Sequence, residues 1–149
     1  FMDGNFVGSI EGNGHKFSNI KITQTDNSRL NAGLFGNLTE KCSITDLSLE
    51  NVSFTIKAGA RNAGASFGLL AGSVSSQSKI SGVKVTSGEL LISSGAYFAT
   101  SDYSIGLVCG MGNVEGIDLS AINCSATGDA PEKVVITVDG NTVNVVINN

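Results

Sequence analysis

The sequence predicts an all-β fold, a parallel β-helix of about four coils that ends in a β-hairpin. Three observations support this prediction: a six-residue apolar pattern occurs four times, a glycine-containing segment precedes each copy, and residues 134–147 have the pattern of a hairpin. A chain of 149 residues, 41% of them hydrophobic, is long enough to build one domain around a substantial core. We therefore expect a single β-helix domain over residues 1–149.

The repeated unit has apolar residues at its first, fourth and sixth positions. Its apolar–polar–apolar ending has the period of a strand with one buried face, and the Gly, Ser, Thr and Asn residues around it oppose a helix. One short strand cannot bury its face alone, whereas stacked copies pair in parallel and place equivalent residues ~4.8 Å apart. The four copies are Phe17–Ile22, Ile44–Leu49, Ile80–Val85 and Val114–Leu119.

Stacking of these units predicts three columns of apolar side chains inside the protein and three polar columns outside. The inner columns would be Phe17/Ile44/Ile80/Val114, Ile20/Leu47/Val83/Ile117 and Ile22/Leu49/Val85/Leu119. The outer columns would be Asn19/Asp46/Gly82/Gly116, Lys21/Ser48/Lys84/Asp118 and Thr23/Glu50/Thr86/Ser120. Such columns favour a solenoid over a β-sandwich, because the strands of a sandwich need no fixed internal frame.

A glycine-containing segment before each unit is expected to form a tight corner, because glycine permits positive φ and close backbone approach. The segments are Phe6–Gly8, Gly33–Gly36, Leu69–Gly72 and Leu107–Gly110. Their last glycines precede the units by 9, 8, 8 and 4 residues, so we expect the fourth coil to be shortened.

The repeats are predicted to cover about residues 6–31, 32–66, 67–104 and 105–130. Further strands are expected at Val52–Ile56 and Leu90–Ile92, and side loops at 57–66 and 93–104. Solenoids commonly place their binding residues on loops of this kind.

The C-terminal segment 131–149 is predicted to be a hairpin that caps the last coil or begins the next module of a longer chain. Asp139–Gly140 favours a two-residue type I′ turn. One face of the hairpin would then carry Val134, Ile136, Val138, Val143 and Val145. The chain starts without an initiator methionine or a signal peptide, from which we expect a fragment of a longer protein.

Composition excludes two classes of function. The net charge is −4 and the few basic residues are scattered, whereas a nucleic-acid binder needs clustered Lys and Arg. No apolar run approaches the ~18 residues of a membrane span, so this segment is not expected to insert into a membrane. Cys42, Cys109 and Cys124 form neither a CxxC motif nor a metal-binding spacing, and we expect them to be buried as small hydrophobic residues.

The tetrads GLFG, LLAG and LVCG, each followed by an apolar six-residue unit, resemble the GLUG-type repeats of bacterial surface proteins. The opening residues 6–22, FVGSIEGNGHKFSNIKI, are similar to the first coil of such domains, especially those of gut Bacteroidetes. The resemblance covers roughly residues 3–128. It implies a right-handed parallel β-helix on a secreted or cell-surface protein, often adhesin-like or attached to peptidases and glycan-handling modules. Because the family has no agreed catalytic residues, it assigns no site.

Catalytic patterns in the chain are incomplete. Gly64–Gly68 matches the G-x-S-x-G nucleophile elbow, but that motif needs a strand-to-helix turn and a later histidine, and the one histidine is His15. We expect Ser66 to lie in a loop leading into a strand, and His15 to cap a turn by hydrogen bonding. A glycosidase pair of carboxylates lies ~5–10 Å apart, and the predicted outer columns bring no such pair together. We predict no catalytic residue, no metal site and no cofactor.

Three aromatic residues in the predicted side loop 93–104 are the candidate ligand contacts, because exposed rings stack on sugars. These are Tyr97, Phe98 and Tyr103. The alternative is that Phe98 and one tyrosine anchor the loop on the solenoid.

The sequence therefore predicts a non-catalytic, adhesin-like module at a bacterial cell surface that displays or binds, with a glycan or a host or cell-surface protein as its partner. Two alternatives stay open. One is the accessory or catalytic β-helix of a polysaccharide-active enzyme, such as a lyase or glycoside hydrolase. The other is a purely structural spacer.

Overall fold

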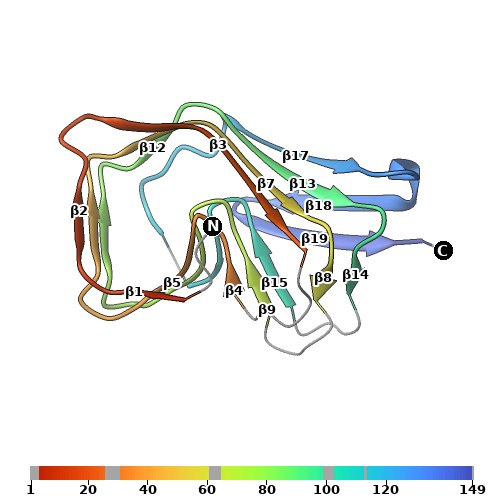
Figure 1. The fold of residues 1–149 in the computed structure, drawn as a ribbon, viewed down its shortest axis with the longest axis horizontal. Helices are drawn as coiled ribbons and strands as arrows, with labels where there is room; N and C mark the ends of the chain where they lie inside the picture. The colour runs from red at the N-terminus through yellow and green to blue at the C-terminus, as the bar shows by residue number, and fades with distance from the viewer. Residues whose placement is uncertain (1–3, 26–30, 61–64, 99–102, 113, 149) are drawn as a thin grey trace.

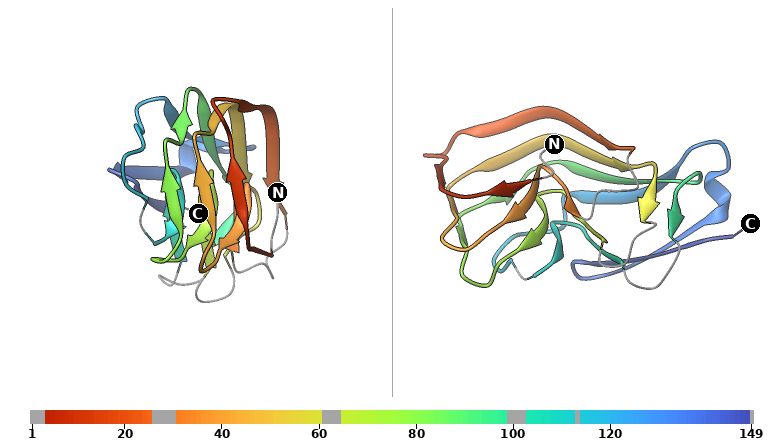
Figure 2. Two further views of the ribbon diagram at one scale, coloured as in Figure 1. Left: turned by 90° about the vertical axis from the view of Figure 1, so that its left-hand side faces the viewer. Right: turned by 60° about the horizontal axis from the view of Figure 1, so that its bottom comes forward.

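The computed structural model is a parallel β-solenoid of about three turns, extended by a C-terminal hairpin (Figure 1). It describes residues 4–25, 31–60, 65–98, 103–112 and 114–148. The predicted fold class is confirmed, while the number of full turns is about three rather than four. Figure 2 shows equivalent strands of successive turns side by side, with the order of the turns following the sequence. The described residues contain one 3₁₀ helix, η1 (Pro131–Lys133), and no α-helix.

Each turn visits four walls in the same order. The first wall contains β1 (Asn5–Phe6), β5 (Phe35–Leu38), β10 (Ala71–Val74) and β16 (Cys109–Met111). The second wall contains β2 (Ser9–Glu11), β6 (Ser43–Thr45) and β11 (Lys79–Ser81).

The third wall is the longest. It contains β3 (Lys16–Gln24), β7 (Ser48–Ile56), β12 (Lys84–Val85), β13 (Gly88–Ser93) and β17 (Ile122–Thr127). All of its pairings are parallel.

The fourth wall contains β4 (Asn31–Ala32), β9 (Ala65–Phe67) and β15 (Tyr103–Gly106), followed by β19 (Thr142–Ile147) and β18 (Val134–Asp139) of the hairpin. The predicted side loops add a small parallel pair, β8 (Gly59–Ala60) with β14 (Tyr97–Phe98).

Residues in the left-handed region produce the spacing of the repeated unit. Asp46 (φ +52°) and Gly82 (φ +66°) turn the chain between the second and third walls, each three residues before the end of its unit. Asn19 (φ +59°) and Asn51 (φ +50°) bend the third wall in the same way. Asn, Asp and Gly tolerate this conformation better than other residues. The left-handed residue breaks the strict alternation of a strand, so two apolar side chains three positions apart both point inward.

Ladder register confirms the predicted columns for the second and third turns and corrects them for the first. Ile44 pairs with Ile80, and Leu49 pairs with Val85. In the first turn, however, Ile10 and not Phe17 lies beside Ile44. Phe17 lies beside Leu49 instead.

The reason for the correction is that the second turn has the same pattern at two successive bends, in residues 44–49 and in residues 49–54. Phe17–Ile22 is equivalent to residues 49–54, because Ile20 pairs with Val52 and Ile22 pairs with Phe54. The first bend of the first turn, between Ile10 and Phe17, is also two residues longer than the equivalent bend of the second turn, between Ile44 and Leu49.

The fourth unit, 114–119, departs from the prediction more strongly. It forms no strand, and Val114, Ile117 and Leu119 are half-buried rather than stacked in ladders on the third turn. The shortening of this turn is confirmed by register. Fifteen positions separate Ser73 from Gly88, whereas eleven separate their partners Met111 and Ile122.

The glycine-rich tetrads form an inward bend between the fourth and first walls, which Figure 1 shows between β4 and β5. Leu69 and Leu70 at its tip are fully buried. The backbones of successive bends lie in contact, so a Cβ built on Gly68 would come within 2.6 Å of the Cα of Cys109. Each leucine buried here contributes about 1.5–3 kcal/mol relative to an exposed one.

The C-terminal hairpin extends the fourth wall, because β19 pairs antiparallel with β15. Asp139 pairs with Thr142, so the two-residue loop is Gly140–Asn141 and not the predicted Asp139–Gly140. Gly140 has φ +57° while Asn141 is not in the positive-φ region, which is the pattern of a type II′ turn.

The predicted apolar face of the hairpin is confirmed, since cross-strand pairs share a face. Val138 pairs with Val143, and Ile136 pairs with Val145. Val134, Val143 and Val145 are buried in the main core, whereas Val138 near the turn is 45% exposed.

Candidate functional site

Two of the three predicted ligand-contact residues hold the hairpin against the solenoid. The hydroxyl of Tyr103 donates a hydrogen bond of 2.8 Å to the carbonyl oxygen of Val145. The ring of Phe98 packs against the Tyr103 ring, with 4.7 Å between their centroids. Tyr97, next to Phe98 in β14, is 54% exposed. Of this cluster, Tyr97 offers most of its ring to solvent.

The G-x-S-x-G segment does not present a nucleophile. Ser66 lies in the middle of β9 rather than in the predicted loop, because it pairs with the turns on either side. It has no exposed surface, and its hydroxyl has no hydrogen-bond partner. It is paired with Asn31 on one side and Ser104 on the other. Gly64 lies outside the described residues.

The predicted turn-capping role of His15 is confirmed. Its Nδ1 lies 2.9 Å from the carbonyl oxygen of Gly12, and its backbone N–H donates to the same oxygen at 2.8 Å. The imidazole therefore stabilises the longer bend of the first turn.

Two carboxylates of the predicted outer columns, Glu50 and Asp118, have structural partners. Glu50 accepts from the ammonium group of Lys16 at 2.8 Å, in an exposed ion pair. Asp118 accepts from the backbone N–H of Ser120, and this hydrogen bond holds the pKa of the Asp118 carboxyl below its usual value. Among the described residues, no group of three or more His, Cys, Asp or Glu could hold a metal ion.

The prediction of buried cysteines is confirmed for Cys42 and Cys109 but not fully for Cys124. All three are free thiols, with Cys42 and Cys109 buried and Cys124 half-buried. Burial raises the pKa of each thiol, in Cys124 to about 11.

The outer columns differ from the predicted ones because the register of the first turn differs. Ser48 lies between Lys16 and Lys84, and Ser18 lies beside Glu50. Two outer columns of four residues run along the third wall. They are Lys21/Ser53/Glu89/Asn123 and Thr23/Thr55/Leu91/Ser125.

These third-wall columns form a regular polar surface on the solenoid. Inward residues such as Phe54 and Leu90 are fully buried, while their outward neighbours Ser53 and Thr55 are half-buried and Glu89 is exposed. Hydroxyl, amide and charged groups therefore repeat at the ~4.8 Å spacing of the strands. Sequence reasoning placed the outer surface on the repeated units and missed these columns, although the strands Val52–Ile56 and Leu90–Ile92 were the available signal.

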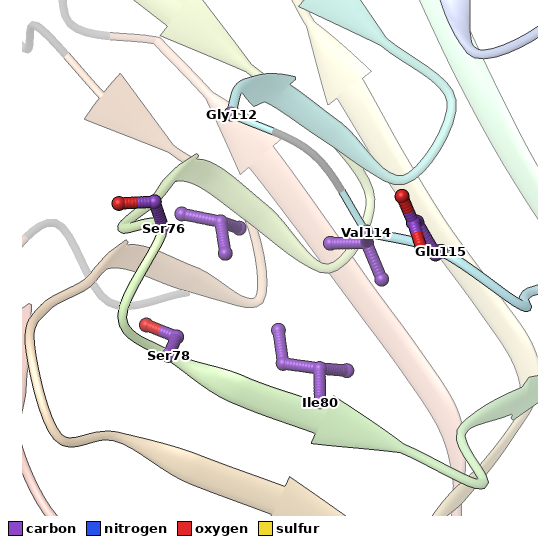
Figure 3. A pocket seen from close by; sticks show the side chains of 7 residues that line it. Ser76, Ser78, Ile80, Gly112, Val114 and Glu115 are labelled. Atoms are coloured by element: carbon purple, nitrogen blue, oxygen red, sulfur yellow. The ribbon is translucent and has the colours of Figure 1, made fainter.

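A cavity of about 530 Å³ lies between β11 and the shortened fourth turn, which adds no described strand to the second wall (Figure 3). Ile80 and Val114 project toward the same space from different segments, with Ser76 and Ser78 at its side. Val74, Gly112 and Glu115 complete the lining. We call this cavity the notch.

Two further findings do not concern one particular site. In the part of the chain that the structure describes, no helix is long and apolar enough to cross a membrane. Comparison of the chain with protein-family models, with curated proteins and with solved structures gives no match.

Proposed function

We propose that this chain is a non-catalytic, adhesin-like β-solenoid module at a bacterial cell surface, which presents a binding face for a glycan. The location and the adhesin-like role come from the resemblance of the glycine tetrads to GLUG-type repeats. The binding role is supported by one structural observation above all, the polar columns on the outer face of the third wall.

The third-wall face suits a ligand that carries many hydroxyl groups. Its two longest columns offer a lysine, a glutamate, an asparagine and four hydroxyl side chains. Groups of both hydrogen-bonding kinds therefore alternate along a rigid surface, and the single leucine, Leu91, gives one apolar patch. Tyr97, in the strand that follows β13 in the chain, supplies an exposed aromatic side chain.

A glycan-array measurement with a matched pair of variants tests the proposal. Thr55 and Thr45 are both half-buried outward residues on middle strands, of the third and second walls respectively. Thr55→Arg should weaken glycan binding at least ~10-fold, which equals the loss of about 1.4 kcal/mol. Thr45→Arg, the control, should bind like the original chain, and Tyr97→Ala should weaken binding if the ring stacks on the sugar.

Three outcomes contradict the proposal and separate the alternatives. Cleavage of a polysaccharide by the purified chain would favour the enzyme. Binding only to a cell-surface protein would replace the glycan as the ligand class. No binding in either assay would favour a structural spacer.

A further inference from the structure

In the described structure, the second wall has one stacked strand fewer than the first and third walls. The first wall has β16 stacked on β10, and the third wall has β17 stacked on β13. Between them, the fourth turn is four residues shorter than the third and places no described strand beside β11. The notch is the space that a fourth strand of the second wall would fill.

The floor of the notch offers backbone hydrogen-bonding groups. The N–H of Lys79 donates to Cys42, and the carbonyl of Ser81 accepts from Asp46, so both residues face β6. Because alternate residues of a strand direct their N–H and C=O groups to opposite sides, those of Ile80 are directed to the notch. Such an edge is a ready template for another strand.

The side chains of the notch continue a column of isoleucines. Ile10, Ile44 and Ile80 stack in register, and Ile44 in the middle has no exposed surface. Ile80 at the end of the column is half-buried, and Val74 and Val114 lie beside it. An aliphatic side chain placed over Ile80 would extend the column by one step and give Ile80 the burial that Ile44 has.

The shape of the notch selects a single strand. β16 and β17 project beyond β11 on the two sides of the notch. In a second copy, β2 lies in one edge together with β1 and β3, so β16 and β17 would stop that edge before β2 reached β11. A short extended peptide meets no such obstacle.

We propose that the notch binds an extended segment of a partner polypeptide as the fourth strand of the second wall. The segment carries a branched aliphatic residue over Ile80 and polar residues at the two flanking positions, which point outward. Backbone hydrogen bonds supply the affinity and the aliphatic position supplies the selectivity, as in other cases of strand addition. This site is separate from the proposed glycan face and does not depend on it.

Binding of short capped peptides, followed by fluorescence anisotropy and by NMR, tests the proposal. The probe is a seven-residue peptide with valine at its centre and alternating threonine and lysine around it. Two matched peptides have aspartate at the centre, or N-methyl groups on the backbone amides that face β11. Both should bind at least ~10-fold more weakly, because the first loses the apolar contact and the second loses hydrogen bonds. The backbone amide signal of Ile80 should shift on binding of the valine peptide.

Two variants at opposite ends of one column locate the site. Ile80→Thr should weaken binding of the valine peptide at least ~10-fold. Ile10→Thr, at the other end of the column and also half-buried, should leave binding unchanged. Ser76→Trp, which fills the notch from an exposed position, should abolish binding without altering the core.

Several outcomes would overturn the proposal. These are no binding of the valine peptide at millimolar concentration, equal binding of the N-methylated peptide, or an equal loss in Ile10→Thr. Self-association of the chain that Ile80→Thr abolishes would make a second copy the occupant and would equally contradict a separate partner. A normal glycan-array result for Ile80→Thr would show that the two proposed sites are independent.

Discussion

Asn19 and Asn51 show how single residues set the course of the chain. Both adopt positive φ, and the side-chain amide of Asn51 donates to the side-chain oxygen of Asn19 at 2.8 Å. In the third turn Ser87 takes over, with its hydroxyl accepting from the backbone N–H of Asn51 at 2.7 Å. The two asparagines therefore bend their strands and link the first turn to the second, while Ser87 links the second turn to the third.

Replacement of Gly68 by alanine should destabilise the protein by about 1–3 kcal/mol, the usual cost of overpacking a well-packed core. The new Cβ would lie 2.5 Å from the carbonyl oxygen of Ala71 and 2.6 Å from the Cα of Cys109, both backbone atoms. Urea unfolding followed by circular dichroism measures the change. Gly4→Ala is the matched control, because a Cβ there meets no atom within 4 Å. Equal stability of the two variants would disprove the close packing of the bends.

The Cys124 thiol should make stability fall at alkaline pH. Its pKa is raised from 9.0 to about 11, so the unfolded chain loses this proton at lower pH than the folded chain. The contribution is present below pH 9 and is lost as the pH rises from 9 to 11. Urea unfolding at several pH values should show a smaller alkaline loss for Cys124→Ala than for the original chain. The same slope in both would mean that the thiol is not shielded from water.

At the scale of elements, the hairpin replaces the contacts that another turn would make. The side chain of Asn141 accepts from the N–H of Val108 at 2.8 Å and donates to the carbonyl of Cys109 at 2.9 Å. Its backbone carbonyl also accepts from the N–H of Leu107. These groups of the last inward bend are buried and would otherwise have no next turn to bond.

Asn141→Ala should destabilise the protein by about 2 kcal/mol, because it leaves a buried N–H and a buried carbonyl without these partners. Thermal or urea unfolding measures the effect. Asn144→Ala on the same hairpin is the control, and it should change stability by less than about 0.5 kcal/mol because Asn144 is exposed. If the two variants were equally stable, the hairpin turn would not be docked on the bend.

The elements of the second and third turns could be predicted from the sequence, because each apolar unit there has one counterpart at the same bend. The first turn could not, because Phe17–Ile22 fits the pattern of either bend and only the ladder decides between them. The hairpin was predictable from the sequence, but its two turn residues were not. A turn at Asp139–Gly140 and a turn at Gly140–Asn141 place the same valines on one face, so the apolar pattern does not distinguish them.

At the scale of the whole molecule, the middle turn should be the most stable region. β7 pairs with β3 on one side and with β12 and β13 on the other, whereas β3 is paired on one side in the described structure. Amides of β7 should therefore exchange with solvent more slowly than those of β3, as native-state hydrogen exchange would measure. Equal exchange rates would indicate that the turns open together rather than from the edge.

The candidate surfaces were less accessible from sequence than the fold. The sequence grouped Tyr97, Phe98 and Tyr103 because they are close together in the chain. The hairpin residue that accepts a hydrogen bond from Tyr103 comes some forty residues later, and Phe98 packs against the Tyr103 ring. The sequence signal for the notch was the short gap of 4 residues between the last glycine tetrad and the fourth apolar unit. That gap signals a missing length of chain, and only the stacking of β16 and β17 shows which wall lacks a strand.

The hairpin makes the two ends of the solenoid different. β19 lies beside β15 and is covered on its other side by β18, so the fourth wall extends two strands past β15. A further turn stacked on β16 and β17 would therefore find its place on the fourth wall already filled by the hairpin. At the opposite end β1, β2 and β3 each carry a parallel partner on one side, in the described residues. Stacking of a further copy in register is therefore expected on the face formed by β1, β2 and β3 rather than over the hairpin.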